Sequence, residues 1–231
     1  MSSTEKSSLH TAWQALWERW QASPFLETTL PAERLAAELE RGFQRLYKAY
    51  ARRGRHYHNG THLLALFEAW QNFHRQLRDP DTVALAIWYH DAVYNPLRKD
   101  NESRSAQWAQ QDLQRWGLAP EKIQTVVHMI EVTAHHHRLP EQINHDLLWF
   151  LDFDLGILAS PTDRYTLYVE QVRKEYRWIP EALYRQGRVK VLKHMLAQDF
   201  IYHTPTFRQT HERNARDNLR KEIAYWDHLY G

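Results

Sequence analysis

An adjacent histidine and aspartate, His90-Asp91, close an apolar run that begins at Val83, and a further histidine, His62, precedes that run. Consecutive side chains on a helix point about 100° apart, so both can reach one ion only near a helix end. Pro96 predicts such an end shortly after the pair. Imidazole and carboxylate ligands suit a divalent ion that activates water. The pattern therefore predicts a metal site, provided that a later carboxylate joins it.

Two later aspartates, Asp152 and Asp154, lie within the otherwise apolar stretch from Leu147 to Leu158. Burying a carboxylate costs free energy unless a cation or hydrogen-bond donors compensate its charge. One of the two is therefore expected to be a metal ligand and the other a supporting partner. Taken alone, the His90-Asp91 pair is more typical of a chance dipeptide at a helix end, with Asp91 capping the helix or pairing with a nearby arginine, and only the accompanying residues favour a metal site.

The segment His58-Asn59-Gly60-Thr61-His62 predicts a helix start at Asn59, which is a favoured N-cap residue. His62 then lies in the first turn and can face an ion on the core side. His58 lies just outside the helix, where a proton donor could meet a substrate; the alternative for His58 is a hydrogen bond to a backbone carbonyl. The zinc-protease helix needs a glutamate beside its first histidine, and position 59 is asparagine, which excludes that motif.

The 231 residues, 43% of them hydrophobic, are enough for one sizeable core, and we expect a single domain over residues 1–231. The 30 basic and 28 acidic residues leave a net charge of +2, so no strong field attracts nucleic acid or an anionic membrane. Cysteine is absent, which excludes disulfides and thiolate ligands. The N-terminus has no apolar core of signal-peptide length, so a cytoplasmic protein without a membrane span is expected.

Apolar residues recur at helical spacing along most of the chain, and glycine is scarce, which predicts an all-α fold. Packing helices are expected at about 8–53, the metal-site core at about 55–160, and further helices at about 161–230. Proline, glycine and capping residues divide these regions. The helices are predicted at about 9–20, 31–50, 59–70, 80 to past 91, 100–116, 121–134, 141–151, 162–177, 180–198 and 210–230.

A histidine, an adjacent His-Asp and a distant aspartate, all on helices, together resemble the HD superfamily of metal-dependent phosphohydrolases. The segment Tyr57 to His62 is similar to the signature of its cyclic-nucleotide phosphodiesterase branch. Over about 55–218 the chain resembles a group of small bacterial HD phosphohydrolases. The resemblance implies an HD-like helical bundle with additional N- and C-terminal helices, and makes His58 the proton donor to the leaving oxygen. It implies the metal ligands His62, His90, Asp91 and Asp154.

The chain departs from the phosphodiesterase pattern directly after the His-Asp pair. In that branch a further histidine follows at short spacing, whereas positions 92–95 read Ala-Val-Tyr-Asn. A centre with one ion and a centre with two both remain open. The run His135-His136-His137 could supply another ligand, as extra histidines do in some HD subfamilies, or it could be a solvated surface run.

The expected reaction is hydrolysis of a phosphate ester, either a monoester or a diester, of a nucleotide or a related small metabolite. Asp91 is expected to orient the attacking water, besides binding metal. Phosphate charge needs cations, and the substrate-binding candidates are Arg55, Lys99 and Arg188. Glu102 could contact the water or a second ion, or could simply favour the start of a helix. The ligand types admit Mn, Fe, Co, Ni, Zn or Mg.

A second class of function fits the same residues. An HD-like helical fold could keep its ion for structure, or bind a nucleotide without turning it over, as a regulatory module. Nucleic acid is not expected as a partner, because the charge is nearly balanced and no recognition motif is present. If the chain associates, a homodimer is the commonest outcome.

Overall fold

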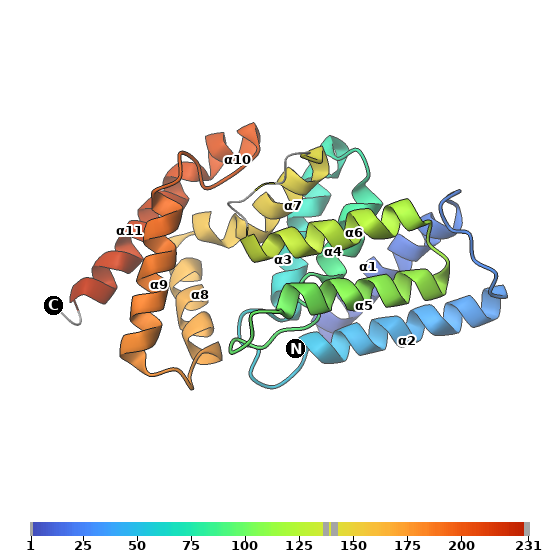
Figure 1. The fold of residues 1–231 in the computed structure, drawn as a ribbon, viewed down its shortest axis with the longest axis horizontal. Coiled ribbons are helices and arrows are strands. Elements are labelled where there is room, and N and C mark those ends of the chain that lie inside the picture. The colour runs from blue at the N-terminus through green and yellow to red at the C-terminus, as the bar shows by residue number, and fades with distance from the viewer. Residues whose placement is uncertain (1, 136–138, 140–142, 229–231) are drawn as a thin grey trace.

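The computed structural model describes residues 2–135, 139 and 143–228. Those residues form helices joined by turns and loops, and no β-strand, which confirms the all-α prediction (Figure 1). None of their helices is both long enough and apolar enough to cross a bilayer. The elements are α1 Ser3–Gln21, α2 Ala32–Tyr50, α3 Gly60–Phe73, η1 His74–Gln76, α4 Pro80–Tyr89, α5 Asn101–Trp116, α6 Pro120–Val132, η2 Thr133–His135, α7 His145–Asp154, η3 Leu155–Ala159, α8 Thr162–Glu175, α9 Glu181–Leu196, α10 Pro205–Thr210 and α11 Glu212–His228.

Helix α4 is enclosed by its neighbours. Every residue from Thr82 to Tyr89 is buried, and α4 contacts α1, α3, α5, α6 and α7. A helix that is apolar all round is stable only inside a protein, so the other helices must surround it. Any displacement of α4 would disturb five packing contacts at once. The residues that follow its last turn are therefore held in a well-defined position.

Tryptophan rings join the N-terminal helices to this buried helix. Trp13 of α1 packs edge to face against Trp88 of α4 and Trp116 of α5, with ring centroids 5.2 and 5.8 Å apart. A Cβ atom at Gly42 of α2 would lie 2.5 Å from the ring of Trp116. Glycine at this position therefore lets α2 approach α5 closely. This packing holds α1, α2 and α5 together beside α4.

Helices α8, α9 and α11 form a group to one side of the α1–α7 bundle (Figure 1). The guanidinium of Arg188 in α9 donates to both carboxylate oxygens of Glu222 in α11, at 2.8 and 3.0 Å. Tyr165 of α8 donates its hydroxyl to the same carboxylate at 2.6 Å. All three side chains are largely shielded from solvent, so the ion pair and its hydrogen bond hold three helices together. This group supplies one wall of the site described below.

The predicted end of α4 is wrong, and one short helix near the C-terminus was not predicted. Helix α4 ends at Tyr89 and not past Asp91, because the Nδ1–H of His90 donates to the carbonyl of Ile87 and the chain then turns. The predicted helix at 210–230 corresponds to α11, Glu212–His228, and the short helix α10 that precedes it was not predicted. Thr204 caps α10 by accepting from the N–H of Phe207, and a break at residue 211 separates α10 from α11.

Candidate metal centre

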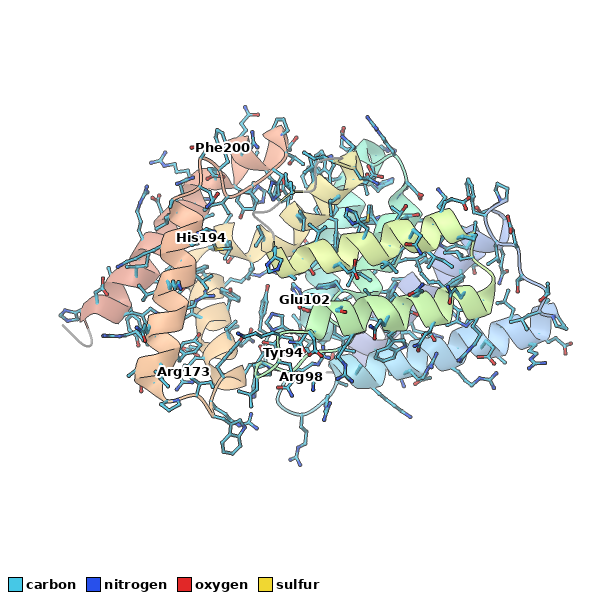
Figure 2. The ribbon with its side chains drawn as sticks, in the orientation of Figure 1. Tyr94, Arg98, Glu102, Arg173, His194 and Phe200 are labelled. Carbon is cyan, nitrogen blue, oxygen red and sulfur yellow. The ribbon has the colours of Figure 1, made fainter. Side chains whose placement is uncertain are left out.

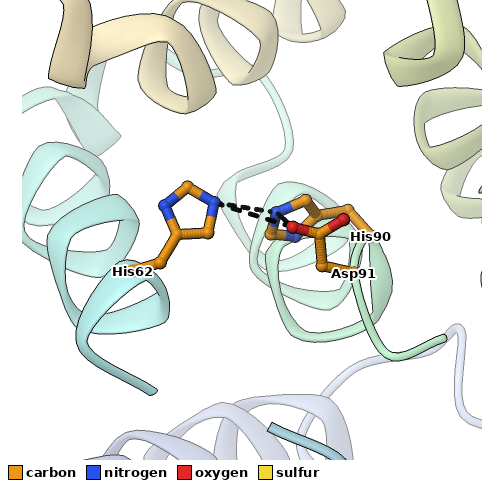
Figure 3. Close-up of side chains that lie close together, drawn as sticks. All are labelled: His62, His90 and Asp91. Carbon is orange, nitrogen blue, oxygen red and sulfur yellow. Dashed lines mark hydrogen bonds and ion pairs between the residues drawn. The ribbon is translucent and has the colours of Figure 1, made fainter. Parts of the chain in front are cut away.

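His62 projects from the first turn of α3. The Asn59 side chain accepts the N–H of Thr61 and so starts the helix at the position that the sequence predicts. The His62 ring is buried, and the ring of Tyr57 packs against it with centroids 4.8 Å apart. The helix start and the aromatic contact together point its Nε2 atom into the space between α3 and the end of α4 (Figure 3).

His90 and Asp91 lie at the turn that follows α4. Because the Nδ1–H of His90 donates to Ile87, Nε2 is the ring nitrogen left to bind a metal ion once it has given up its proton. The backbone N–H of Asp91 donates to the Tyr50 hydroxyl at 3.2 Å. Neighbouring side chains on a continuing helix would diverge, whereas this turn lets imidazole and carboxylate converge.

Four side chains meet at this point. The Nε2 atoms of His62 and His90 are 3.2 Å apart, and the Asp91 Oδ2 atom lies 3.4 Å from the Nε2 of His90 (Figure 3). Asp154, the last residue of α7, places its Oδ1 atom 3.1 Å from His62 Nε2 and 3.7 Å from His90 Nε2. His62, His90 and Asp91 could hold a metal ion, since their ligand atoms lie within 4.8 Å of one another. Asp154 is not part of that group of three, but it lies beside both imidazoles and stays a predicted ligand.

The charges of the four groups depend on one another. Burial alone would lower the pKa of His90, but the Asp91 carboxylate raises that pKa to about 9. Burial alone would raise the pKa of Asp91, but His90 lowers it well below its ordinary range. Burial lowers the pKa of His62. When both imidazoles are neutral, the two carboxylates carry a net negative charge that a divalent ion would balance.

His58 forms a dyad with Glu175, a residue that the sequence reasoning did not identify. The Nδ1–H of His58 donates to Glu175 Oε2 at 2.6 Å, and the ring of Tyr94 stacks on His58 at 4.2 Å. The other carboxylate oxygen accepts the backbone N–H groups of His56, Tyr57 and His58. Burial opposes protonation of His58, but Asp91 and Glu175 together raise its pKa. The dyad therefore favours the protonated form of His58, whose ring centroid lies 5.9 Å from that of His62.

We expect Glu175→Gln to lower the pKa of His58, because the neutral amide removes a charge that favours the imidazolium. Burial alone would raise the pKa of Glu175, but His58 lowers it from the ordinary value of 4.5 to about 2. The ionised carboxylate therefore stabilises the folded state, and this contribution is fully present above about pH 4.5. That contribution is lost as the pH falls toward 2. Histidine NMR titration and urea unfolding at several pH values measure both effects. An unchanged His58 titration in the variant would contradict the dyad.

Arg55, predicted to bind substrate phosphate, is occupied by backbone carbonyls. Its guanidinium donates to the carbonyls of His58, Asp91 and Ala92, at 3.1, 2.6 and 2.9 Å. It also lies over the ring of Tyr94, 5.6 Å from the centroid. These contacts give Arg55 a structural role, since they join the segment before α3 to the turn after α4. Its contact with phosphate stays a prediction.

The other two predicted cations lie in different surroundings. Lys99 is exposed and is not among the residues that line the cavities at the metal centre. Arg188 lines a cavity that also reaches His90, but its guanidinium is paired with Glu222. Glu102, the candidate contact to water or a second ion, lines the same cavity. Of the histidine run, His135 is exposed, and His136 and His137 lie outside the described residues.

Asp152, the other aspartate of the apolar stretch, accepts hydrogen bonds from a turn and does not contact a predicted metal ligand through them. Its carboxylate accepts the backbone N–H of His203 and of Thr204, both at 2.7 Å, and the hydroxyl of Thr204 at 2.6 Å. The side chain is fully buried. It therefore links α7 to the start of α10.

We expect Asp152→Asn to lower the free energy of unfolding by about 1–3 kcal/mol, because the amide nitrogen cannot accept a backbone N–H. The content of bound metal should stay that of the wild type. Urea unfolding and elemental analysis of the same preparation measure the two quantities. Loss of metal with unchanged stability would instead make Asp152 a ligand.

Comparison of the chain with models of protein families, with curated proteins and with solved structures finds no match. The geometry of the four side chains and the dyad is therefore the basis for assigning a function.

Proposed function

We propose that this protein is a metal-dependent phosphohydrolase that cleaves a phosphate ester of a nucleotide or a related small metabolite. The observation that carries the proposal is the convergence of His62, His90, Asp91 and Asp154, which come from three separate parts of the chain. A proton donor, His58, stands beside them. The motif resemblance to the HD superfamily supports the same reaction class.

The residues present fit a divalent ion. His62, His90, Asp91 and Asp154 would hold it, and the hydrogen bond from His90 Nδ1–H to Ile87 sets the ring in the right tautomer. When bound, such an ion lowers the pKa of a coordinated water and polarises a phosphoryl oxygen. Two imidazole and two carboxylate ligands suit Mn, Fe, Co, Ni or Zn, and also Mg.

The chain's own acid completes the reaction. As the oxygen of the attacking water bonds to phosphorus and the water releases a proton to solvent, the bond from phosphorus to the ester oxygen breaks, and His58 donates a proton to that departing oxygen. Glu175 favours the protonated imidazole and holds its ring in place through Nδ1. Asp91 is the candidate to orient the attacking water, since its carboxylate lies at the centre and on a cavity wall. The products are a phosphate and an alcohol for a monoester, or a phosphomonoester and an alcohol for a diester.

The test combines elemental analysis of the purified protein with phosphate release from a panel of nucleotides and from generic mono- and diesters. Apo-protein is reloaded separately with Mn, Mg, Ni and Co. We expect turnover that requires one of these ions. If nucleotides raise the melting temperature but none of the esters is hydrolysed with any ion, the protein is a ligand-binding module with an HD-like site, and the hydrolase proposal fails.

A further inference from the structure

Two cavities reach the metal centre. The first, of about 630 Å³, is lined by His90, Asp91 and a face of α9, and is called here the α9 cavity. The second, of about 520 Å³, is lined by His62 and other residues of α3, and is called the α3 cavity. Asp154 and Tyr168 line both. A phosphate held at the centre therefore has two places for the group attached to it.

The wall of the α9 cavity opposite the metal centre is apolar and aromatic. Leu183, Gly187 and Val191 are four residues apart, so they share one face of α9, and all three line the cavity. Leu183 is 60% exposed and Val191 is 50% exposed, so nothing in the described chain covers this face. Tyr94 and Tyr176 add aromatic rings to the same cavity. Such a wall suits an uncharged, ring-bearing group.

The charges of the α9 cavity disfavour a second anionic group. Its two arginines are paired, Arg98 with Asp100 at 2.6 Å and Arg188 with Glu222 at 2.8 Å. Glu102 also lines the cavity and is negatively charged. Figure 2 shows Arg98 and Glu102 at the end of α5 that faces α9. A second anionic group on the substrate would lie near the Glu102 carboxylate. Both arginines of the cavity are already paired with carboxylates, so neither is free to bind that group.

The position of His58 selects between the two cavities. His58 lines the α9 cavity and is not among the residues of the α3 cavity, whose walls carry the exposed Arg164 and the polar Gln171. A general acid must lie within hydrogen-bond reach of the oxygen that it protonates. The departing oxygen, and the group attached to it, should therefore lie on the α9 side.

We propose that the α9 cavity holds the leaving group of the substrate, a neutral alcohol with a largely apolar ring, and that Gly187 sets the size of ring it accepts. This inference rests on the proposed phosphohydrolase function. The ester oxygen keeps the electron pair of the bond to phosphorus, takes its proton from His58, and departs as the alcohol into the α9 cavity. The phosphate remains at the centre.

Gly187 offers a clean test, because a Cβ atom there would have no atom within 4 Å. Its φ angle is not positive, so a larger side chain fits the helix without backbone strain. Gly187→Leu should therefore project a side chain into the α9 cavity. Gly156, which lines the α3 cavity, is the matched control, since a Cβ there is equally free of contacts and its φ is also not positive.

The experiment compares wild type, Gly187→Leu and Gly156→Leu on methyl, phenyl and 1-naphthyl phosphate. In Gly187→Leu, we expect kcat/KM for 1-naphthyl phosphate to fall by roughly 10-fold or more relative to methyl phosphate, since poor fit in an apolar pocket costs about this much. Gly156→Leu should leave the ratio unchanged. Binding of 1-naphthol to each protein without metal, measured by calorimetry, should weaken by a similar factor in Gly187→Leu alone.

The outcomes separate this inference from the proposed function. If the esters are hydrolysed but Gly156→Leu, and not Gly187→Leu, discriminates against the large ester, the leaving group lies in the α3 cavity and the inference is overturned. Equal losses for methyl and 1-naphthyl phosphate in Gly187→Leu also overturn it. If no ester is hydrolysed, the phosphohydrolase proposal fails, while selective loss of 1-naphthol binding in Gly187→Leu still supports an apolar ring site in the α9 cavity.

Discussion

His62→Ala and Asp91→Ala should each bind the divalent ion at least about 10- to 100-fold more weakly than the wild type, and ion-dependent turnover should be lost with it. Removing even a group that only supports a ligand costs this much, and these residues are proposed to be ligands. Because the Asp91 carboxylate raises the pKa of His90, its loss should also lower that pKa. Elemental analysis after dialysis, together with a metal titration by calorimetry, measures the affinity.

A surface histidine provides the control for these variants. His128→Ala removes an exposed imidazole from α6 and should bind metal like the wild type. Far-UV circular dichroism shows whether each variant keeps its helices, because His62 is buried and its loss could disturb packing. Unchanged metal content in folded His62→Ala and Asp91→Ala would refute the metal centre.

His58→Ala should lower kcat by about 100- to 10,000-fold, which is the usual contribution of a general acid, without loss of bound metal. The effect should depend on the leaving group. An ester of an acidic phenol, such as p-nitrophenyl phosphate, releases a stable anion and needs little help from a proton donor. An alkyl ester releases a basic alkoxide and needs that help. Steady-state kinetics on both kinds of ester, with metal content measured in parallel, tests this role.

His56→Ala is the matched control for this prediction. Its backbone N–H donates to Glu175, as that of His58 does, but its ring does not line either cavity at the centre. Its kinetics should resemble those of the wild type. An equal loss on alkyl and p-nitrophenyl esters in His58→Ala would show that His58 positions the substrate or the fold and does not protonate the leaving oxygen.

The helices were predictable because their signals are local. Apolar residues at helical spacing mark the buried face, and Asn59, Pro80 and Gly117 mark boundaries by their own conformational preferences. The predicted end of α4 was wrong because side-chain hydrogen bonds end the helix there, one of them local, from His90 to the carbonyl of Ile87, and others from a distant residue. Arg55 takes the carbonyls of Asp91 and Ala92, which favours a turn at the point where the sequence predicted more helix.

The candidate metal ligands were also predictable as residue types, because His90-Asp91 and an aspartate in an apolar stretch are unusual locally. Which aspartate belongs to the centre was not. Asp152 and Asp154 are two residues apart on α7, so they point to different faces of the helix. Only the packing of α10 against α7 shows that Asp152 meets backbone donors, while Asp154 meets His62.

The sequence by itself determined an all-α chain and a set of imidazoles and carboxylates suited to a divalent ion, since both follow from residue type and short-range spacing. The tertiary structure alone decided that Glu175 orients His58, that Arg55 holds a turn, and that a face of α9 lines the cavity beside the centre. Glu175 lies 117 residues from His58 in the chain. No local pattern carries such a pairing, because it arises only when separately folded helices pack and bring buried charges within hydrogen-bond distance.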